Sequence, residues 1–177
     1  MSLLGILGLA RSDSAPAGRN PLADAIRDRL KRLPLRRAEF VAAFAGLLMR
    51  VAYADLEISP AERAALPRLI ADHAGLSPDE SATVAEIVTR QATGFAGIEY
   101  ALLTRAFNEV ATEQEKEQLI DCLYAIATAG STVSVVEDDE IRAVARALML
   151  SHQQFIAIRH RYKEQLEIIQ AARQLRR

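Results

Sequence analysis

Three carboxylates lie within eight positions in the segment ADLEISPAE, residues 54–62. Asp55, Glu57 and Glu62 all offer oxygen donors, and sites built from oxygen alone favour calcium or magnesium over zinc. Glu62 also has a structural explanation, because it lies three residues after Ser59 and can complete a capping box at a helix start. Asp55 and Glu57 follow the end of an apolar helical pattern, where the negative helix terminus disfavours a carboxylate. The segment therefore indicates either a divalent-cation site or a turn between two helices.

The spacing of these acids does not fit an EF-hand loop. If Asp55 takes the first loop position, Pro60 stands where the loop requires glycine and Leu66 where it requires a bidentate glutamate. Elsewhere the chain has no His or Cys neighbours at metal-ligand spacing and no nucleophile motif. Its histidines are His73, His152 and His160, of which we expect His152 to lie on the surface. We predict a protein that is not an enzyme and whose cofactor, if it has one, is calcium or magnesium.

These acids lie between elements that are helical by pattern. Apolar residues recur every three or four positions, the spacing that places them on one helix face. The pattern covers residues 38–54, 64–70, 84–88, 98–110, 119–127, 141–148 and 155–169. No stretch of six residues alternates apolar and polar without also fitting a helix, and aromatic residues make up only 5% of the chain. We predict an all-α domain of about seven to eight helices.

Helix starts expose an internal repeat. A Ser or Thr followed three residues later by Glu or Gln forms a capping box. Such pairs are Ser59 with Glu62, Ser77 with Glu80, Thr112 with Glu115, Ser134 with Glu137 and Ser151 with Gln154. Ser59 and Ser134 are 75 residues apart, Ser77 and Ser151 are 74 apart, and a long apolar segment precedes the first serine of each unit. We therefore predict two pseudo-symmetric three-helix repeats, at about 38–92 and 113–162, that share one core.

The predicted helical domain spans residues 21–177, with residues 163–177 as a helical extension beyond the second repeat. Residues 1–20 are interpreted as a flexible N-terminal segment, because the stretch at 10–20 is rich in Ser, Ala, Gly and Pro. The extension carries apolar residues such as Leu166. It either packs on the domain or mediates a homodimer.

The composition of the chain indicates which partners the protein can have and in which compartment it works. The chain has 22 basic and 23 acidic residues among 177, which leaves no overall field to attract nucleic acid. Cys122 is the single cysteine, and its apolar neighbours predict a buried, unreactive thiol without a disulfide. We expect a cytoplasmic protein, because the apolar stretch at residues 1–10 is too short to span a membrane.

Two basic segments leave an alternative open. Residues 26–37 carry six Lys or Arg, and residues 158–177 carry more. Such segments are usually solvated helix faces. An apolar stretch such as residues 3–9 together with a polybasic patch is, however, also the combination that attaches proteins to anionic lipid. Peripheral attachment to the inner membrane is therefore a second interpretation of these residues.

Residues 51–80 and 102–162, which include AYADLEISPAE, resemble the TerB-like family of tellurite-resistance-associated proteins. The family motif is approximately Ala-x-Ala-Asp-Gly-x-Ile/Val-Ser-x-x-Glu, once in each half, and the resemblance covers about residues 38–162. It implies an all-helical protein of the stress response that acts at the inner face of the membrane. It also implies that the acidic motif residues bind a divalent cation.

The resemblance assigns roles position by position, and the chain departs from the motif at two places. Leu56 stands where the family usually has Gly, and Gly130 stands where the second half should have Asp. The acids that match the motif are Asp55, Glu57, Glu62 and, in the second half, Glu137. If the two turns meet across the core, these four acids would converge on one ion, with low affinity because charges are missing.

Two functions follow from these observations. The first is a non-enzymatic stress-response protein associated with tellurite resistance that binds a divalent cation through acidic inter-helix turns. The second is a helical protein-interaction adaptor, peripherally associated with the membrane, in which the turns are only helix caps and an unknown protein is the partner. Ion-dependent stability distinguishes them, because only the first predicts that a cation raises the free energy of unfolding.

Overall fold

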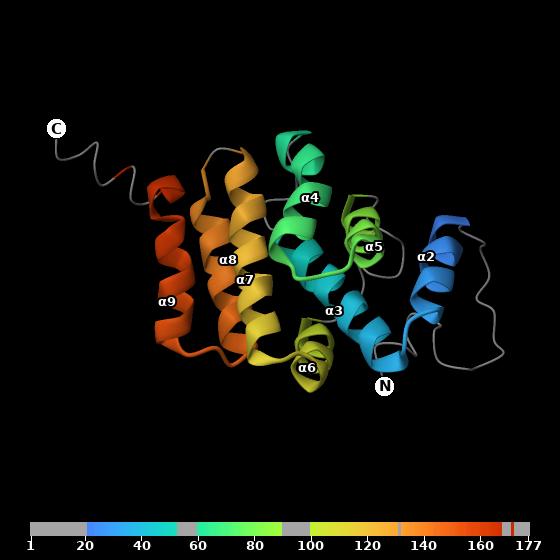
Figure 1. Cartoon of the computed structure of the whole chain (residues 1–177). Helices are drawn as coiled ribbons and strands as arrows, with labels where there is room; N and C mark the ends of the chain where they lie inside the picture. The colour runs from blue at the N-terminus through green and yellow to red at the C-terminus, as the bar shows by residue number, and fades with distance from the viewer. Residues whose placement is uncertain (1–20, 53–59, 90–99, 131, 168–170, 172–177) are drawn as a thin grey trace.

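The computed structural model describes residues 21–52, 60–89, 100–130, 132–167 and 171 (Figure 1). Over this part of the chain it contains eight α-helices and no named strand. The helices are α2 (Pro21–Lys31), α3 (Leu35–Ala52), α4 (Pro60–His73), α5 (Pro78–Thr89), α6 (Tyr100–Val110), α7 (Glu113–Ala127), α8 (Val135–Ala147) and α9 (His152–Arg161). Two short 3₁₀ helices, η1 (Thr128–Gly130) and η2 (Lys163–Gln165), follow α7 and α9. The predicted all-α fold of about eight helices is confirmed.

Capping boxes start the helices at the predicted positions. In α7, α8 and α9 the N-cap hydroxyl accepts a hydrogen bond from the third helical residue, whose side chain accepts one from the N-cap backbone. These N-caps are Thr112, Ser134 and Ser151. Ser77 and Glu80 exchange the same two bonds at α5, at 2.8 and 3.4 Å. The predicted box at Ser59 lies outside the described residues.

Two long helices, α3 and α7, form the centre of the domain (Figure 1). α3 packs on α5, α6, α7 and α8, whereas α7 packs on α4, α8 and α9 as well as on α3. In α3 every residue from Phe40 to Met49 is buried, as expected for a helix that is apolar around most of its circumference. Cys122 of α7 is buried, as predicted, and burial raises the pKa of its thiol. These two helices also supply six of the seven residues that line a small cavity.

Two turns 74 residues apart share an unusual backbone conformation. Gly75 after α4 has a φ of 61°, and Met149 after α8 has a φ of 62°. Around Met149 the chain makes the two hydrogen bonds of a Schellman motif, from Met149 N–H to Arg146 C=O and from Leu150 N–H to Ala145 C=O. The equal backbone conformation of Gly75 and Met149 agrees with the predicted repeat at these two turns. The symmetric packing of two whole halves stays a prediction.

The last helix is shorter than its apolar pattern indicates. The periodicity predicts a helix over 155–169, but α9 ends just before Tyr162 and η2 follows. Leu166 then adopts an extended backbone and is 1% exposed, so this part of the predicted extension packs on the domain. A tertiary contact explains the early end, because the Tyr162 hydroxyl donates a hydrogen bond to Asp121 of α7 at 2.9 Å. That bond holds the chain against α7 at the point where α9 ends.

Candidate functional site

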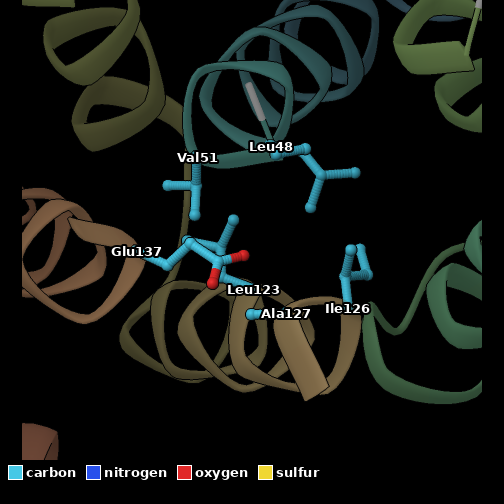
Figure 2. Close-up of a pocket in the computed structure, with 7 residues that line it drawn as sticks. Leu48, Val51, Leu123, Ile126, Ala127 and Glu137 are labelled. Atoms are coloured by element: carbon cyan, nitrogen blue, oxygen red, sulfur yellow. The ribbon is translucent and has the colours of Figure 1, made fainter. Parts of the chain in front are cut away.

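A small cavity lies between the last turns of α3 and α7 (Figure 2). Its volume of about 10 Å³ leaves room for no more than about one water molecule. Six apolar residues and one acid line it: Leu48, Val51 and Ala52 from α3, Leu123, Ile126 and Ala127 from α7, and Glu137 from α8. This junction of α3, α7 and α8 therefore brings one carboxylate to the ends of the two central helices.

The apolar lining consists of residues 75 positions apart in the sequence. Leu48 corresponds in this way to Leu123, Val51 to Ile126, and Ala52 to Ala127. The same spacing separates the first capping serine of each predicted repeat. Ala127 is also the last residue of α7, and Ala52 is the last described residue of α3. The two motif-bearing segments that follow these helices therefore begin beside one cavity.

Glu137 is 7% exposed and reaches from the first turn of α8 toward the cavity (Figure 2). Its Oε2 accepts a hydrogen bond from the Ser134 N–H at 2.8 Å, and Ser134 Oγ accepts one from the Glu137 N–H at 3.2 Å. The carboxylate thus caps α8 while it lies beside the last turns of α3 and α7. Its capping role is confirmed, and its role as a ligand stays a prediction.

The other candidate ligands lie where the structure gives no side-chain position. Asp55 and Glu57 fall outside the described residues, and Glu62 lies in the first turn of α4 with its side chain outside them. Within the described ranges, no three His, Cys, Asp or Glu side chains form a group that could hold a metal ion. The convergence of four acids on one ion is therefore still a prediction.

The three acids that follow Glu137 are paired with arginines. Asp138 is buried and accepts hydrogen bonds from Arg159 Nε and Nη2, both at 2.8 Å, and from the Tyr124 hydroxyl at 2.7 Å. Burial alone would raise the pKa of Asp138, but the hydrogen bonds from Arg159 and Tyr124 bring it below its ordinary value. The other two pairs are Asp139 with Arg142 and Glu140 with Arg50. Arginine charge therefore compensates all three of these acids.

A second polar cluster, centred on the carboxylate of Asp121, connects α4, α7 and α9. Nδ1 of His73 lies 2.8 Å from Asp121 Oδ2, while Asp121 Oδ1 accepts hydrogen bonds from Arg161 and the Tyr162 hydroxyl, both at 2.9 Å. Asp121, the partner of His73, is 48 residues away in the sequence, so local spacing does not reveal the pair. Burial and the hydrogen bond to Asp121 raise the pKa of Tyr162, so its hydroxyl stays a donor. The cluster joins three helices and explains the position of the end of α9.

The basic segment at 26–37 lies on α2, the first turn of α3 and the turn between them. Two of its arginines are paired with acids of α5: Arg29 with Glu86 at 2.6 Å, and Arg37 with Glu80 at 2.5 Å. Part of the positive charge of this segment is therefore neutralised by ion pairs within the domain. No helix in the described part of the chain combines the length and apolar character needed to cross a membrane.

These features define a class of protein: an all-α domain whose two buried central helices line one shared cavity. The family model of tellurite resistance protein TerB matches residues 41–160, from within α3 to the last turn of α9. The chain belongs to the TerB family, as its motif predicts. No curated protein and no solved structure gives a significant match.

Proposed function

We propose that this TerB-family protein is a non-enzymatic stress-response protein associated with tellurite resistance that binds a divalent cation, calcium or magnesium, at the junction of α3, α7 and α8. One observation carries the proposal: the buried carboxylate of Glu137 lines the same cavity as Ala127, the last residue of α7, and Ala52, the last described residue of α3. Carboxylate and backbone oxygens are the ligands that these ions prefer.

Helix polarity supports a cation at this junction. The last turn of a helix carries carbonyl groups without intrahelical partners and a partial negative charge. The last turn of α7 and the last described turn of α3 line the cavity together. A bound cation would offset the partial negative charge at the end of α7, and would also offset the cost of placing Asp55 and Glu57 after the apolar helical pattern.

The two motif-bearing segments contribute unequally to this site. Asp55 and Glu57 supply carboxylates from the segment after α3, and Glu62 from the first turn of α4. The segment after α7 has Gly130 at the Asp position, so Glu137 is its contribution. Fewer carboxylates give weaker binding of a hard cation, and we therefore expect the affinity to be low.

Thermal unfolding with EDTA, calcium or magnesium tests this proposal. An ion present at about 100 times its dissociation constant should stabilise the folded protein by roughly 2.7 kcal/mol. In an Asp55→Ala, Glu57→Ala double variant this ion-dependent gain should disappear. Without the ion, the variant should be as stable as the wild type or slightly more stable, because two acids are removed from a helix C-terminus.

A control variant with the same change of charge separates ligand loss from general electrostatics. Asp72 and Glu109 have side chains 55% and 56% exposed, each in a surface ion pair with an arginine of its own helix. The Asp72→Ala, Glu109→Ala double variant should keep the full response to the ion. If no ion shifts the midpoint of the wild type, the acidic turn is only a helix boundary and the adaptor function takes its place.

A further inference from the structure

The chain after α9 returns to the turn that precedes α8. Val133 and Leu166 form an isolated parallel β-bridge. The Val133 N–H donates to the Gln165 carbonyl at 2.9 Å, and the Val133 carbonyl accepts from the Glu167 N–H at 3.1 Å. Residues 163–167, which we name the C-terminal latch, therefore satisfy both backbone groups of Val133, in the way that an added strand pairs with a sheet edge.

Two side chains of the latch fit the surface that it covers. Leu166 is 1% exposed, and it is the one apolar residue among the five of the latch. The Glu167 carboxylate accepts a hydrogen bond from the N–H of Val135, the first residue of α8, at 3.3 Å. A helix start favours such an acid because its first N–H groups have no partner within the helix. The surface at Val133 and Val135, which we name the latch site, therefore accepts an extended segment in which leucine precedes an acidic residue.

The attached latch carries a polar group that the fold does not satisfy. The Oε1 atom of Gln165 is buried and accepts no hydrogen bond from the described residues. A buried polar atom without a partner costs free energy, whereas water satisfies the same atom once the segment leaves the surface. Leu166 is the only buried residue of the latch. A segment held by one side chain and a few hydrogen bonds can open while the rest of the domain stays folded.

Exposed apolar residues extend the latch site along the same turn. Val135 and Val136 are 48% and 54% exposed, and they are two of the five large apolar residues exposed in the described part of the chain. The latch runs from Val133 toward Val135, because its bridge to Val133 is parallel and Glu167 reaches Val135. A ligand that follows this path therefore meets two further apolar side chains.

We propose that the latch site is a docking site for an extended segment of a partner protein, in which leucine precedes an acidic residue, and that the C-terminal latch blocks this site until the partner displaces it. The chemistry of the partner follows from the segment that the site already holds. The latch competes at a high effective concentration because it belongs to the same chain, so a free segment binds well only when the latch is released. This docking requires no bound cation and is independent of the proposed cation site.

The peptide KEQLE, residues 163–167 with blocked ends, tests the site as a separate molecule. In the full chain, Leu166→Asp releases the latch, because burial of a charged side chain is too costly. In amide NMR of this variant, the peptide should shift the Val133 and Val135 signals saturably. Its affinity should be higher than for the wild type, where the latch competes, by about tenfold or more. No saturable shift at these amides in Leu166→Asp overturns the docking site.

Matched controls test the recognition and the competition. A peptide with Leu166→Ala should bind the Leu166→Asp protein more weakly than KEQLE by about tenfold or more, because a buried leucine is lost. Equal binding of the two peptides overturns the proposed partner chemistry. The protein variant Leu35→Ala changes a leucine that is 69% exposed, and it should bind KEQLE as the wild type does. If it binds like Leu166→Asp, the competition by the latch is wrong.

A second variant keeps the test valid if Leu166→Asp does not fold. Glu167→Pro removes both the N–H that donates to the Val133 carbonyl and the carboxylate at Val135. Proline restricts the residue before it to extended conformations, which Leu166 already has, with φ −73° and ψ 121°. We expect KEQLE to bind this variant more tightly than the wild type. Equal binding overturns the competition between peptide and latch.

Hydrogen exchange of the wild type tests whether the latch opens on its own. The Val133 amide should exchange faster than the Ala74 amide by about tenfold or more, because local opening frees it. Ala74 is 1% exposed and donates to the Ile70 carbonyl, so its amide reports on the folded domain. Low urea concentrations should leave the Val133 rate unchanged. If Val133 exchanges only through global unfolding, the latch is a permanent part of the fold and its displacement is wrong.

Discussion

Met149 lies in a backbone conformation that ordinarily belongs to glycine. Its φ of 62° nearly equals that of Gly75, 74 positions earlier, and both residues follow the end of a helix. For a residue with a Cβ this conformation costs roughly 1–2 kcal/mol, because the Cβ comes close to the following carbonyl oxygen. The Met149 side chain recovers little of that cost, since the residue is 70% exposed.

Met149→Gly should therefore raise the free energy of unfolding, by about 0.5–1 kcal/mol after the greater freedom of glycine in the unfolded chain is subtracted. Urea denaturation measures the change. Met149→Ala is the control: it removes the exposed side chain but keeps the Cβ, and it should leave the stability near that of the wild type. An equal gain in both variants would show that the exposed side chain, and not the backbone, is the source of the cost.

Glu80 is a carboxylate whose charge the fold stabilises. Arg37 donates two hydrogen bonds to it, at 2.5 and 2.9 Å, and lowers the pKa of this carboxyl to about 2. The unfolded chain has the ordinary value of about 4.3. Because the folded pKa is the lower one, the ionised form stabilises the native state above about pH 4.3, and this contribution is lost as the pH falls toward 2.

Glu80→Gln should cost about 2 kcal/mol at pH 7, the usual contribution of hydrogen bonds between charged groups. Glutamine still serves the capping box with Ser77, so the loss reports on the Arg37 pair. The difference from the wild type should shrink as urea denaturation is repeated at pH values from 5 down to 2. Glu109→Gln removes an exposed surface pair and should change stability by less than about 0.5 kcal/mol. A Glu80→Gln loss that is constant with pH would contradict this explanation.

For single residues, the sequence predicts contacts within one helical turn but misses contacts between residues that are far apart in the chain. Capping boxes such as Ser134 with Glu137 are local, since both partners lie within one turn, and the structure confirms them. Pairs such as Asp138 with Arg159, or His73 with Asp121, join residues 21 and 48 positions apart. Nothing in the local pattern marks those partners, because only the packing of helices brings them together.

Three helices meet at Asp138. Tyr124 of α7 and Arg159 of α9 both donate to this buried carboxylate of α8, and Arg142 adds a third donor at 3.1 Å. The Tyr124 and Tyr162 rings stack, with centroids 5.3 Å apart. The helices of the second predicted repeat are therefore joined by one polar centre within apolar packing.

Asp138→Ala should lower the free energy of unfolding by about 3 kcal/mol, because it leaves the largely buried Arg159 guanidinium without its acid. Asp139→Ala is the neighbouring control. Its side chain is 65% exposed and pairs with Arg142 at 3.3 Å, so the expected loss is below about 0.5 kcal/mol. Replacing both charges, as Asp138→Ala with Arg159→Met, should recover part of the loss in chemical denaturation. No recovery in the double variant would mean that the acid acts mainly through Tyr124.

The length of an element is harder to predict than its existence. Apolar residues at helical spacing locate α3 and α7 because both helices are buried on nearly all sides. The same spacing continues past the end of α9, since Leu166 lies four residues after Tyr162. There the bond of Tyr162 to Asp121 and the bridge of Leu166 to Val133 determine the path of the chain. The apolar spacing predicts which residues are buried. Leu166 is buried as this spacing predicts, but in an extended backbone and not in a helix.

For the whole molecule, the sequence predicts the fold class and part of the site. Helical periodicity and the capping boxes give an all-α domain, and the motif gives the TerB family. The structure adds that residues of α3, the last turn of α7 and Glu137 of α8 line one cavity. From the sequence alone, we could say only that the acids would converge if the two turns met across the core. Which helices are adjacent depends on long-range packing, which local patterns do not reveal. Asp55 and Glu57 keep their predicted roles as hypotheses.

The paired lining of the cavity has an evolutionary consequence. Leu48 and Leu123 contribute side chains of the same size to one small space, and so do Ala52 and Ala127. A larger residue on one side can be accommodated only by a smaller one on the other, since packed interiors tolerate little change in volume. Descendants of such a protein should therefore covary at these positions. Gly130 lies outside this lining, so the residue at the Asp position of the second motif can differ without any change in the volume that Leu48 and Leu123 share.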